Sequence, residues 1–170
     1  MLKFLFRGLT AEPPRGRPLF DALTAEARVR HWYVEGEVPD TLDGRFAVLA
    51  TLTAIAAVRL ERDGAEGDRV SVALTERFIE VMESEHRELG IGDPGLGRTV
   101  RKLVAMLAKR VELWRQVRHL TLSAADATSE SLYRGDFDRS ALAHNAAALQ
   151  RIAERFDATA LPDFEQGRLQ

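Results

Sequence analysis

The chain has 170 residues, of which 45% are hydrophobic, and this fits one globular domain with its own core. The formal net charge of -2 provides no global basic field, which argues against a role in nucleic-acid binding. Because the chain contains no cysteine, disulfide bonds, cysteine zinc sites, iron–sulfur clusters and thiol nucleophiles are excluded.

Residues 1–17 are predicted to form an irregular N-terminal segment, because prolines and a glycine cluster near its end. Within it, Met1–Leu9 is apolar but is broken by Arg7, so it lacks the sustained apolar region of a signal peptide. A cytoplasmic protein is therefore expected. Apolar residues beside cations also suit a membrane interface, so Met1–Leu9 indicates either peripheral contact with the inner membrane or docking on the protein's own core.

Helical periodicity predicts an all-α fold, a single-domain bundle of about five to six helices over 18–157, with a C-terminal tail at 158–170. The first helix is expected from Pro18 to about Arg30, and a structured connection is expected at His31–Gly44. The residues predicted to lie on one side of this helix are Leu19, Phe20, Leu23 and Ala27.

The second helix, Arg45–Arg62, is apolar on almost every face. Such a helix lies either at the centre of a core or in a membrane. Its apolar run is shorter than the roughly 20 residues that cross a bilayer, which favours a central core helix. A loop is expected at Asp63–Asp68, followed by a third helix over Arg69–Leu89 with Gly90 as its C-cap.

The fourth helix is expected at Gly97–Leu120, after a glycine-rich loop that begins at Gly92, and it carries two apolar stripes. The second stripe consists of Met106, Leu113, Val117 and Leu120. A helix with two apolar faces is either sandwiched inside the fold or shares one face with a partner, so a homodimer is one alternative.

The last part of the chain is predicted to hold two more helices. A short one is expected at Ala125–Tyr133 with Ser123 as its cap, and a longer one at Arg139–Phe156. The chain after Ala158 is expected to be frayed.

Glu83 and His86 form an E-x-x-H motif on the third helix, which is the spacing that di-iron bundles use. Such sites need two E-x-x-H motifs and two further glutamates, whereas this chain has one motif. A small metal-binding or di-iron-like enzyme built on Glu83 and His86 is therefore the less favoured alternative, and neither a cofactor nor a metal ligand is predicted. Glu85 is interpreted as an ion-pair partner rather than a perturbed functional carboxylate.

Motifs for nucleotide binding and nucleophilic catalysis are weak or missing. Gly90–Gly95 matches G-x-G-x-x-G, but a helix precedes it instead of a strand, so an interhelical loop is favoured. The sequence has no Walker loop, no H-E-x-x-H and no G-x-S-x-G, so no catalytic residue is predicted.

The segment His31–Phe46 is the most unusual part of the chain, because two adjacent aromatic residues, four acids and two glycines precede the second helix. Asp40, Thr41 and Asp43 suit the cap and first turn of that helix. One interpretation is a rigid turn that orients the core helix. The other is a partner-binding surface, since Trp and Tyr are favoured interface anchors. Residue chemistry alone leaves both open.

This segment resembles the ubiquinol–cytochrome c chaperone family, whose members carry an aromatic residue, Glu-Gly, Asp-Thr and Gly-Arg-Phe before a hydrophobic helix. The matching residues here are Tyr33, Glu35-Gly36, Asp40-Thr41 and Gly44-Arg45-Phe46. No long N-terminal targeting extension is recognised in the sequence, and a bacterial member of the family is therefore expected.

A second similarity to this family is the run Arg87–Asp93, followed by Gly97 and a basic stretch of Arg98, Arg101 and Lys102. Leu132-Tyr133-Arg134 follows downstream in the same order. Eukaryotic members have an Asp-rich stretch before the second motif, and here the acids are Glu80, Glu83 and Glu85.

The resemblance implies a non-enzymatic assembly factor for the cytochrome bc1 complex, which binds cytochrome b or a related respiratory membrane protein. The expected partner-binding residues are Trp32, Tyr33, Glu35, Glu37, Asp40, Asp43, Arg45, Arg87, Asp93, Arg98 and Arg101. Of these, Trp32, Tyr33 and Glu37 are the strongest surface candidates. A helical interaction module of unrelated role is the remaining alternative.

Overall fold

The computed structural model describes residues 16–88 and 93–169, and the side chains of 85–97 and 99 fall outside the description. All the secondary structure in the described residues is helical, which confirms the predicted all-α bundle. The α-helices are α1 (Arg17–Ala27), α2 (Leu42–Leu60), α3 (Gly64–Glu88), α4 (Asp93–Arg118), α5 (Ala124–Leu132), α6 (Arg139–Ala158) and α7 (Leu161–Glu165). Short 3-10 helices lie at Arg30–Trp32 and Glu61–Asp63.

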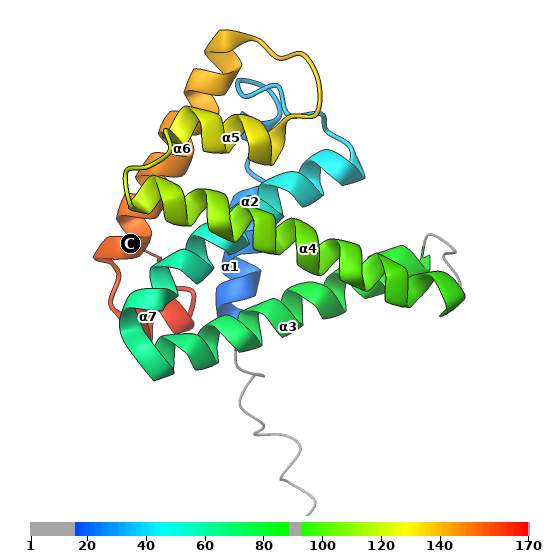
Figure 1. The fold of residues 1–170 in the computed structure, drawn as a ribbon, viewed down its shortest axis with the longest axis vertical. Coiled ribbons are helices and arrows are strands. Elements are labelled where there is room, and N and C mark those ends of the chain that lie inside the picture. The colour runs from blue at the N-terminus through cyan, green and yellow to red at the C-terminus, as the bar shows by residue number, and fades with distance from the viewer. Residues whose placement is uncertain (1–15, 89–92, 170) are drawn as a thin grey trace, which may run out of the picture.

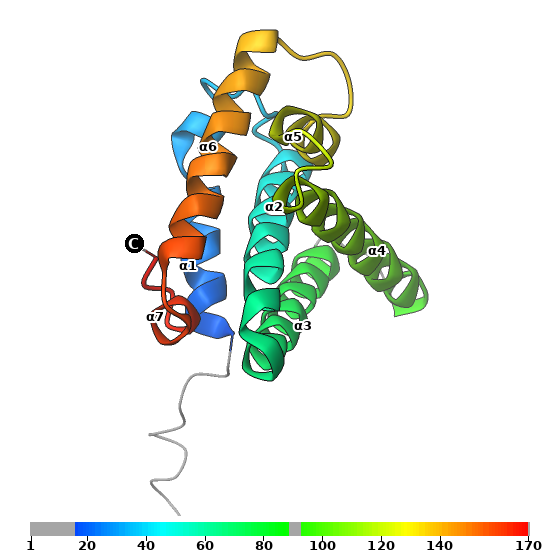
Figure 2. The same ribbon diagram turned by 60° about the vertical axis from the view of Figure 1, so that its left-hand side comes forward.

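The helix α2 forms the centre of the bundle. It contacts α1 and α6 on one side and α3, α4 and α5 on the other (Figures 1 and 2). Every residue from Ala47 to Leu60 is buried, as expected for a helix that is apolar on all faces. Within the described residues, no helix is both long enough and apolar enough to cross a membrane.

The buried face of α1 follows the predicted pattern, and α4 follows its predicted pattern in large part. The buried residues of α1 are Leu19, Phe20, Leu23 and Ala27. On α4, Leu103, Leu107 and Trp114 are buried against the core, and most of the second stripe also packs on that core. Leu120, the fourth member of the second stripe, is 92% exposed and does not pack on the core. The helix is therefore largely sandwiched between α2, α3 and α5.

The predicted loop at Asp63–Asp68 is wrong, because α3 already begins at Gly64. The reversal of the chain is completed within the 3-10 turn Glu61–Asp63, and Gly64 follows it with φ of 58°. A Cβ at Gly67 would lie 2.0 Å from the Leu60 carbonyl oxygen, so a glycine here permits close packing of the two helix ends.

The start of α4 also differs from the prediction. The helix begins at Asp93, four residues before the expected Gly97, so Pro94 and Gly95 belong to its first turn. A proline is compatible with this position because the first helical N–H groups have no partner within the helix. The proposed C-cap at Gly90 lies outside the described residues.

The prediction of a frayed end after Ala158 is also wrong. The helix α7 packs on α1, and Phe164 is fully buried beside Phe156, with ring centroids 5.1 Å apart. The buried Arg59 of α2 donates to the backbone carbonyls of Phe156 and Thr159 at 3.1 and 2.6 Å, and its guanidinium lies 4.6 Å from the Phe164 ring. A polar side chain of the central helix thus binds this end of the chain to the core.

Candidate functional site

Residues 28–41 connect α1 to α2, and this connection is attached to the core by buried side chains and hydrogen bonds. Trp32 is fully buried, and its Nε1 donates a hydrogen bond of 3.0 Å to the Glu26 carbonyl. The Tyr33 hydroxyl donates to the Ala27 carbonyl at 2.5 Å, and burial raises the pKa of Tyr33. The expectation that Trp32 is a surface anchor is therefore wrong, because its indole serves the core.

Gly36 joins two distant parts of the sequence. The Tyr133 hydroxyl and the Asn145 amide both donate to the Gly36 carbonyl, at 2.6 and 2.9 Å. The Asn145 amide also donates to the Tyr133 oxygen at 2.7 Å. A Cβ on Gly36 would lie 2.1 Å from Asn145 Oδ1, so any larger residue displaces this network. Glu35-Gly36 and Leu132-Tyr133-Arg134 thus meet in one structural unit.

The end of the connection sets the start of α2. The Thr41 side chain caps the helix by accepting from the Gly44 N–H at 3.2 Å. A Cβ on Gly44 would lie 1.9 Å from the Pro39 carbonyl oxygen, which explains the glycine. Arg45 Nε donates to Asp40 Oδ1 at 2.6 Å, and this hydrogen bond lowers the pKa of Asp40. The segment therefore acts as a rigid turn that orients the central helix.

His31 connects the same segment to α6. Its Nδ1 lies 3.1 Å from Nε2 of His144, and its Nε2 lies 4.0 Å from Glu26 Oε1. Burial, followed by the neighbouring His144, lowers the pKa of His31. A neutral imidazole pair shares one hydrogen bond, whereas protonation of both rings would place two cations in contact.

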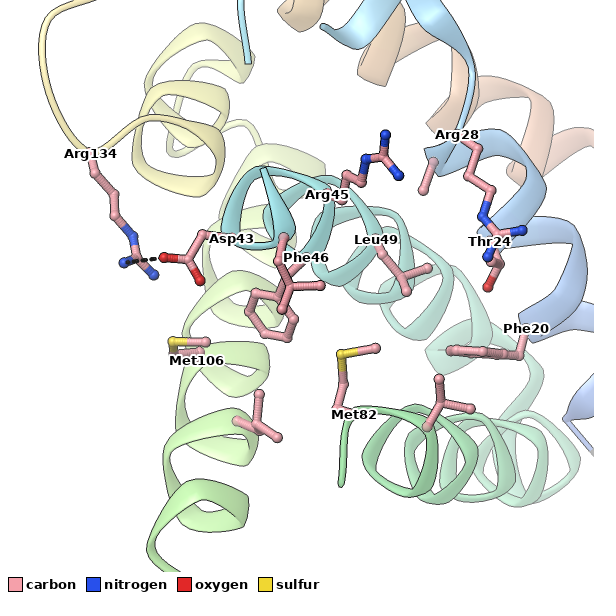
Figure 3. Close-up of a pocket in the computed structure, with 14 residues that line it drawn as sticks. Phe20, Thr24, Arg28, Asp43, Arg45, Phe46, Leu49, Met82, Met106 and Arg134 are labelled. Carbon is pink, nitrogen blue, oxygen red and sulfur yellow. Dashed lines mark ion pairs between the residues drawn. The ribbon is translucent and has the colours of Figure 1, made fainter. Parts of the chain in front are cut away.

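An open groove lies beside the connection at residues 28–41, where α1, α2, α3 and α4 meet (Figure 3). Its volume is about 250 Å³. The apolar residues that line it are Phe20, Ala27, Leu42, Phe46, Leu49, Val81, Met82, Leu103 and Met106. Its polar residues are Thr24, Arg28, Asp43, Arg45 and Arg134. An apolar cleft with a few polar groups at its margin is the usual form of a binding site.

The predicted site residues divide between these two regions. Asp43 and Arg45 line the groove, and the Arg45 guanidinium carbon lies 6.0 Å from the centre of the Tyr33 ring. Glu35 and Glu37 are exposed on the connection. The structure does not bring Arg98 and Arg101 into the groove, since both are exposed on α4. The side chains of Arg87 and Asp93 lie outside the described part.

Several groove residues were not predicted from the sequence to be site residues, above all Phe20, Thr24 and Arg28 of the α1 wall. Their pattern is that of an ordinary amphipathic helix, and no local signal marks them. Met106 did carry a signal, because it belongs to the second apolar stripe of α4, which the sequence predicted to lie either inside the fold or on a face shared with a partner. Methionine adapts its shape readily, which suits Met82 and Met106 to a binding surface.

The described residues contain no group of three or more His, Asp or Glu side chains that could hold a metal ion. Glu83 is half-buried on α3, whereas the side chain of His86 lies outside the description. Within the described residues, the groove therefore offers an apolar surface with arginines at its margin, and no cluster of metal ligands is found.

The chain is similar to a known protein family and to a solved structure. The model of the family described as Ubiquinol-cytochrome C chaperone matches residues 35–170. Among curated proteins, none matches. The crystal structure of the Cbp3 homolog from Brucella abortus is similar with a TM-score of 0.79 and 21% identity, over 100% of this chain and 96% of that one. At this identity the structural similarity concerns the fold.

Proposed function

The chain belongs to the ubiquinol–cytochrome c chaperone family, and on this premise we propose that it is an assembly factor for the cytochrome bc1 complex. Its client is cytochrome b or another membrane subunit of that complex. The function is binding rather than catalysis: the groove covers an apolar client segment until the client meets its partner subunits.

The observation that carries this proposal is the family match, which spans the groove residues contributed by α2, α3 and α4. Membrane subunits expose long apolar segments before assembly, and an apolar groove can shield part of such a segment from water. The two methionines allow the surface to adapt to different side chains. The site of action is the cytoplasmic face of the inner membrane, where a newly made membrane subunit is accessible.

Deleting the gene tests the role in assembly. In the bacterium that carries it, we expect a lower content of assembled bc1 complex, measured by haem spectra of membranes and by native gel electrophoresis. Re-expression of the wild-type chain should restore the complex. An unchanged bc1 content in the deletion strain would refute the assembly role.

Site-specific photocrosslinking tests the groove itself. A photoreactive amino acid in place of Met106, in the groove, should crosslink to cytochrome b in living cells, as identified by mass spectrometry. The matched control replaces Val72, which is 58% exposed on α3 and does not line the groove. Equal crosslinking from both positions would mean that the groove is not the client site.

A further inference from the structure

We infer that the client segment presents a carboxylate beside its apolar side chains, and that Arg28 receives this carboxylate on the α1 wall of the groove. The inference rests on the proposed function and adds the chemistry by which the groove selects its client.

Two of the three arginines that line the groove already have acidic partners. Arg45 donates to Asp40 at 2.6 Å, and a nitrogen of Arg134 lies 3.7 Å from a carboxylate oxygen of Asp43 (Figure 3). Both pairs lie at the N-terminal end of α2 and the nearby chain after α5. On that side of the groove the cationic charge is balanced within the protein.

The α1 wall is different. In the described part of the chain, the exposed guanidinium of Arg28 forms neither an ion pair nor a hydrogen bond. One helical turn earlier, the Thr24 side chain lines the same groove, and its Oγ1 is buried without a hydrogen-bond partner among the described residues. Residues four apart share a helix face, so the two polar groups lie on one wall.

Of these two groups, the exposed one is available to a carboxylate. The Arg28 guanidinium can donate two parallel hydrogen bonds to it, whereas the buried Thr24 Oγ1 is out of reach of a client. Phe20, one turn before Thr24, continues the wall as an apolar surface. A partner that inserts apolar side chains between Phe20 and Met106 therefore provides Arg28 with an acidic partner when it also carries an Asp or Glu.

The size and charge of the groove favour side chains of a protein segment. Its volume of about 250 Å³ falls below the roughly 300–1,000 Å³ of pockets that enclose whole small molecules. Of the three arginines that line it, only Arg28 has no acidic partner among the described residues, so a client lysine at this position would meet an uncompensated positive charge.

Peptide binding to the full chain tests the inference. Overlapping fluorescent peptides covering the cytochrome b of the same genome are titrated with the protein, and binding is followed by fluorescence anisotropy. The peptides that bind should be apolar and contain an Asp or Glu. Arg28→Ala should weaken binding about tenfold, because it removes a charge-assisted pair, and Arg28→Lys should lose less.

The matched control is Arg134→Ala, which removes a groove arginine already paired with Asp43 and should weaken binding less than about threefold. Changing the peptide's acid to its amide should weaken binding to the wild type as much as Arg28→Ala does. The same peptide change should have little effect on Arg28→Ala, because the paired group is already gone. Unfolding curves establish that each variant is folded.

Any of the following outcomes would overturn the inference. The first is equal loss of binding in Arg28→Ala and Arg134→Ala, and the second is no loss when the peptide acid becomes an amide. The third is Arg28-dependent binding of oleate without binding of any peptide, which would make the ligand a lipid. If no peptide binds but gene deletion still lowers the bc1 content, the carboxylate inference fails and the assembly role stands.

Discussion

The connection at residues 28–41 and the groove beside it are contrasting parts of the molecule. The connection carries the most distinctive sequence, yet its Trp32 and Gly36 are held by hydrogen bonds inside the protein. The groove carries few distinctive residues, yet it is open, and its exposed Arg28 has no acidic partner among the described residues. A distinctive sequence can therefore mark the frame of a binding site rather than its surface.

The two regions are nevertheless coupled. The Thr41 cap and the close approach at Gly44 set where α2 begins, and the first residues of α2, Leu42 and Asp43, form part of the groove wall. Apart from Arg28, which also lines the groove, changes in the connection should therefore lower stability and affect the client only through the position of α2. Changes in the groove should affect the client directly.

The largest expected effect comes from truncating the indole in the connection. Trp32→Ala should lower the free energy of unfolding by about 3–5 kcal/mol, because it leaves a cavity in the core. Leu42→Ala, at a groove position that is 49% exposed, should stay within about 0.5 kcal/mol of the wild type. Urea unfolding followed by circular dichroism measures both. Similar losses would erase the contrast between the two regions.

A smaller effect is expected from adding one methyl group at Gly36. Gly36→Ala should lower the free energy of unfolding by about 1–3 kcal/mol, since its Cβ would displace the Asn145 amide. Gly135→Ala is the matched control, because no atom lies within 4 Å of a Cβ there. If Gly36→Ala were as stable as Gly135→Ala, the network around the Gly36 carbonyl would not be rigid.

The histidine pair should make stability depend on pH. Because the pKa of His31 is lowered from 6.5 in the folded state, its contribution is fully present above that value and is lost as the pH falls through the folded pKa. Burial and His144 oppose protonation of His31, with a smaller contribution from Arg151, whereas Glu26 and Glu35 favour it.

His31→Gln should therefore flatten the fall in stability below pH 6.5, measured as urea midpoints across a pH series. His119→Gln serves as the control, because His119 is exposed just after α4 and lies outside the pair. Identical pH profiles for His31→Gln and the wild type would show that the pair does not couple to folding.

The smallest effect on stability, with the largest on function, is expected from Leu42→Asp. A carboxylate in the first turn of α2 favours the helix, so the free energy of unfolding should change by less than about 0.5 kcal/mol. The new charge lies in the groove and should lower the content of assembled bc1 complex. Val72→Asp, outside the groove, should leave it unchanged. A normal bc1 content in the Leu42→Asp strain would count against the groove as the client site.

Much of the fold could be predicted from local patterns. The buried face of α1 follows from apolar periodicity, and the burial of α2 on all sides follows from its almost entirely apolar sequence. The Ser123 cap of α5 follows from residue preference, with Ser123 Oγ accepting from the Asp126 N–H at 3.0 Å. The errors fall at Gly64, Asp93 and the end of the chain. At the first two places glycine and proline suggested loops, whereas at all three the backbone is helical.

The amino-acid sequence alone was sufficient for the all-α class, the central helix and the family resemblance, because each depends on residue order along one helix or one motif. The burial of Trp32 and the assembly of the groove depend on residues from α1, α2, α3 and α4 meeting in space. Arg28 and Thr24 have no special neighbours in the sequence. They stand out only because, among the described residues, the groove wall that they form carries no acidic group.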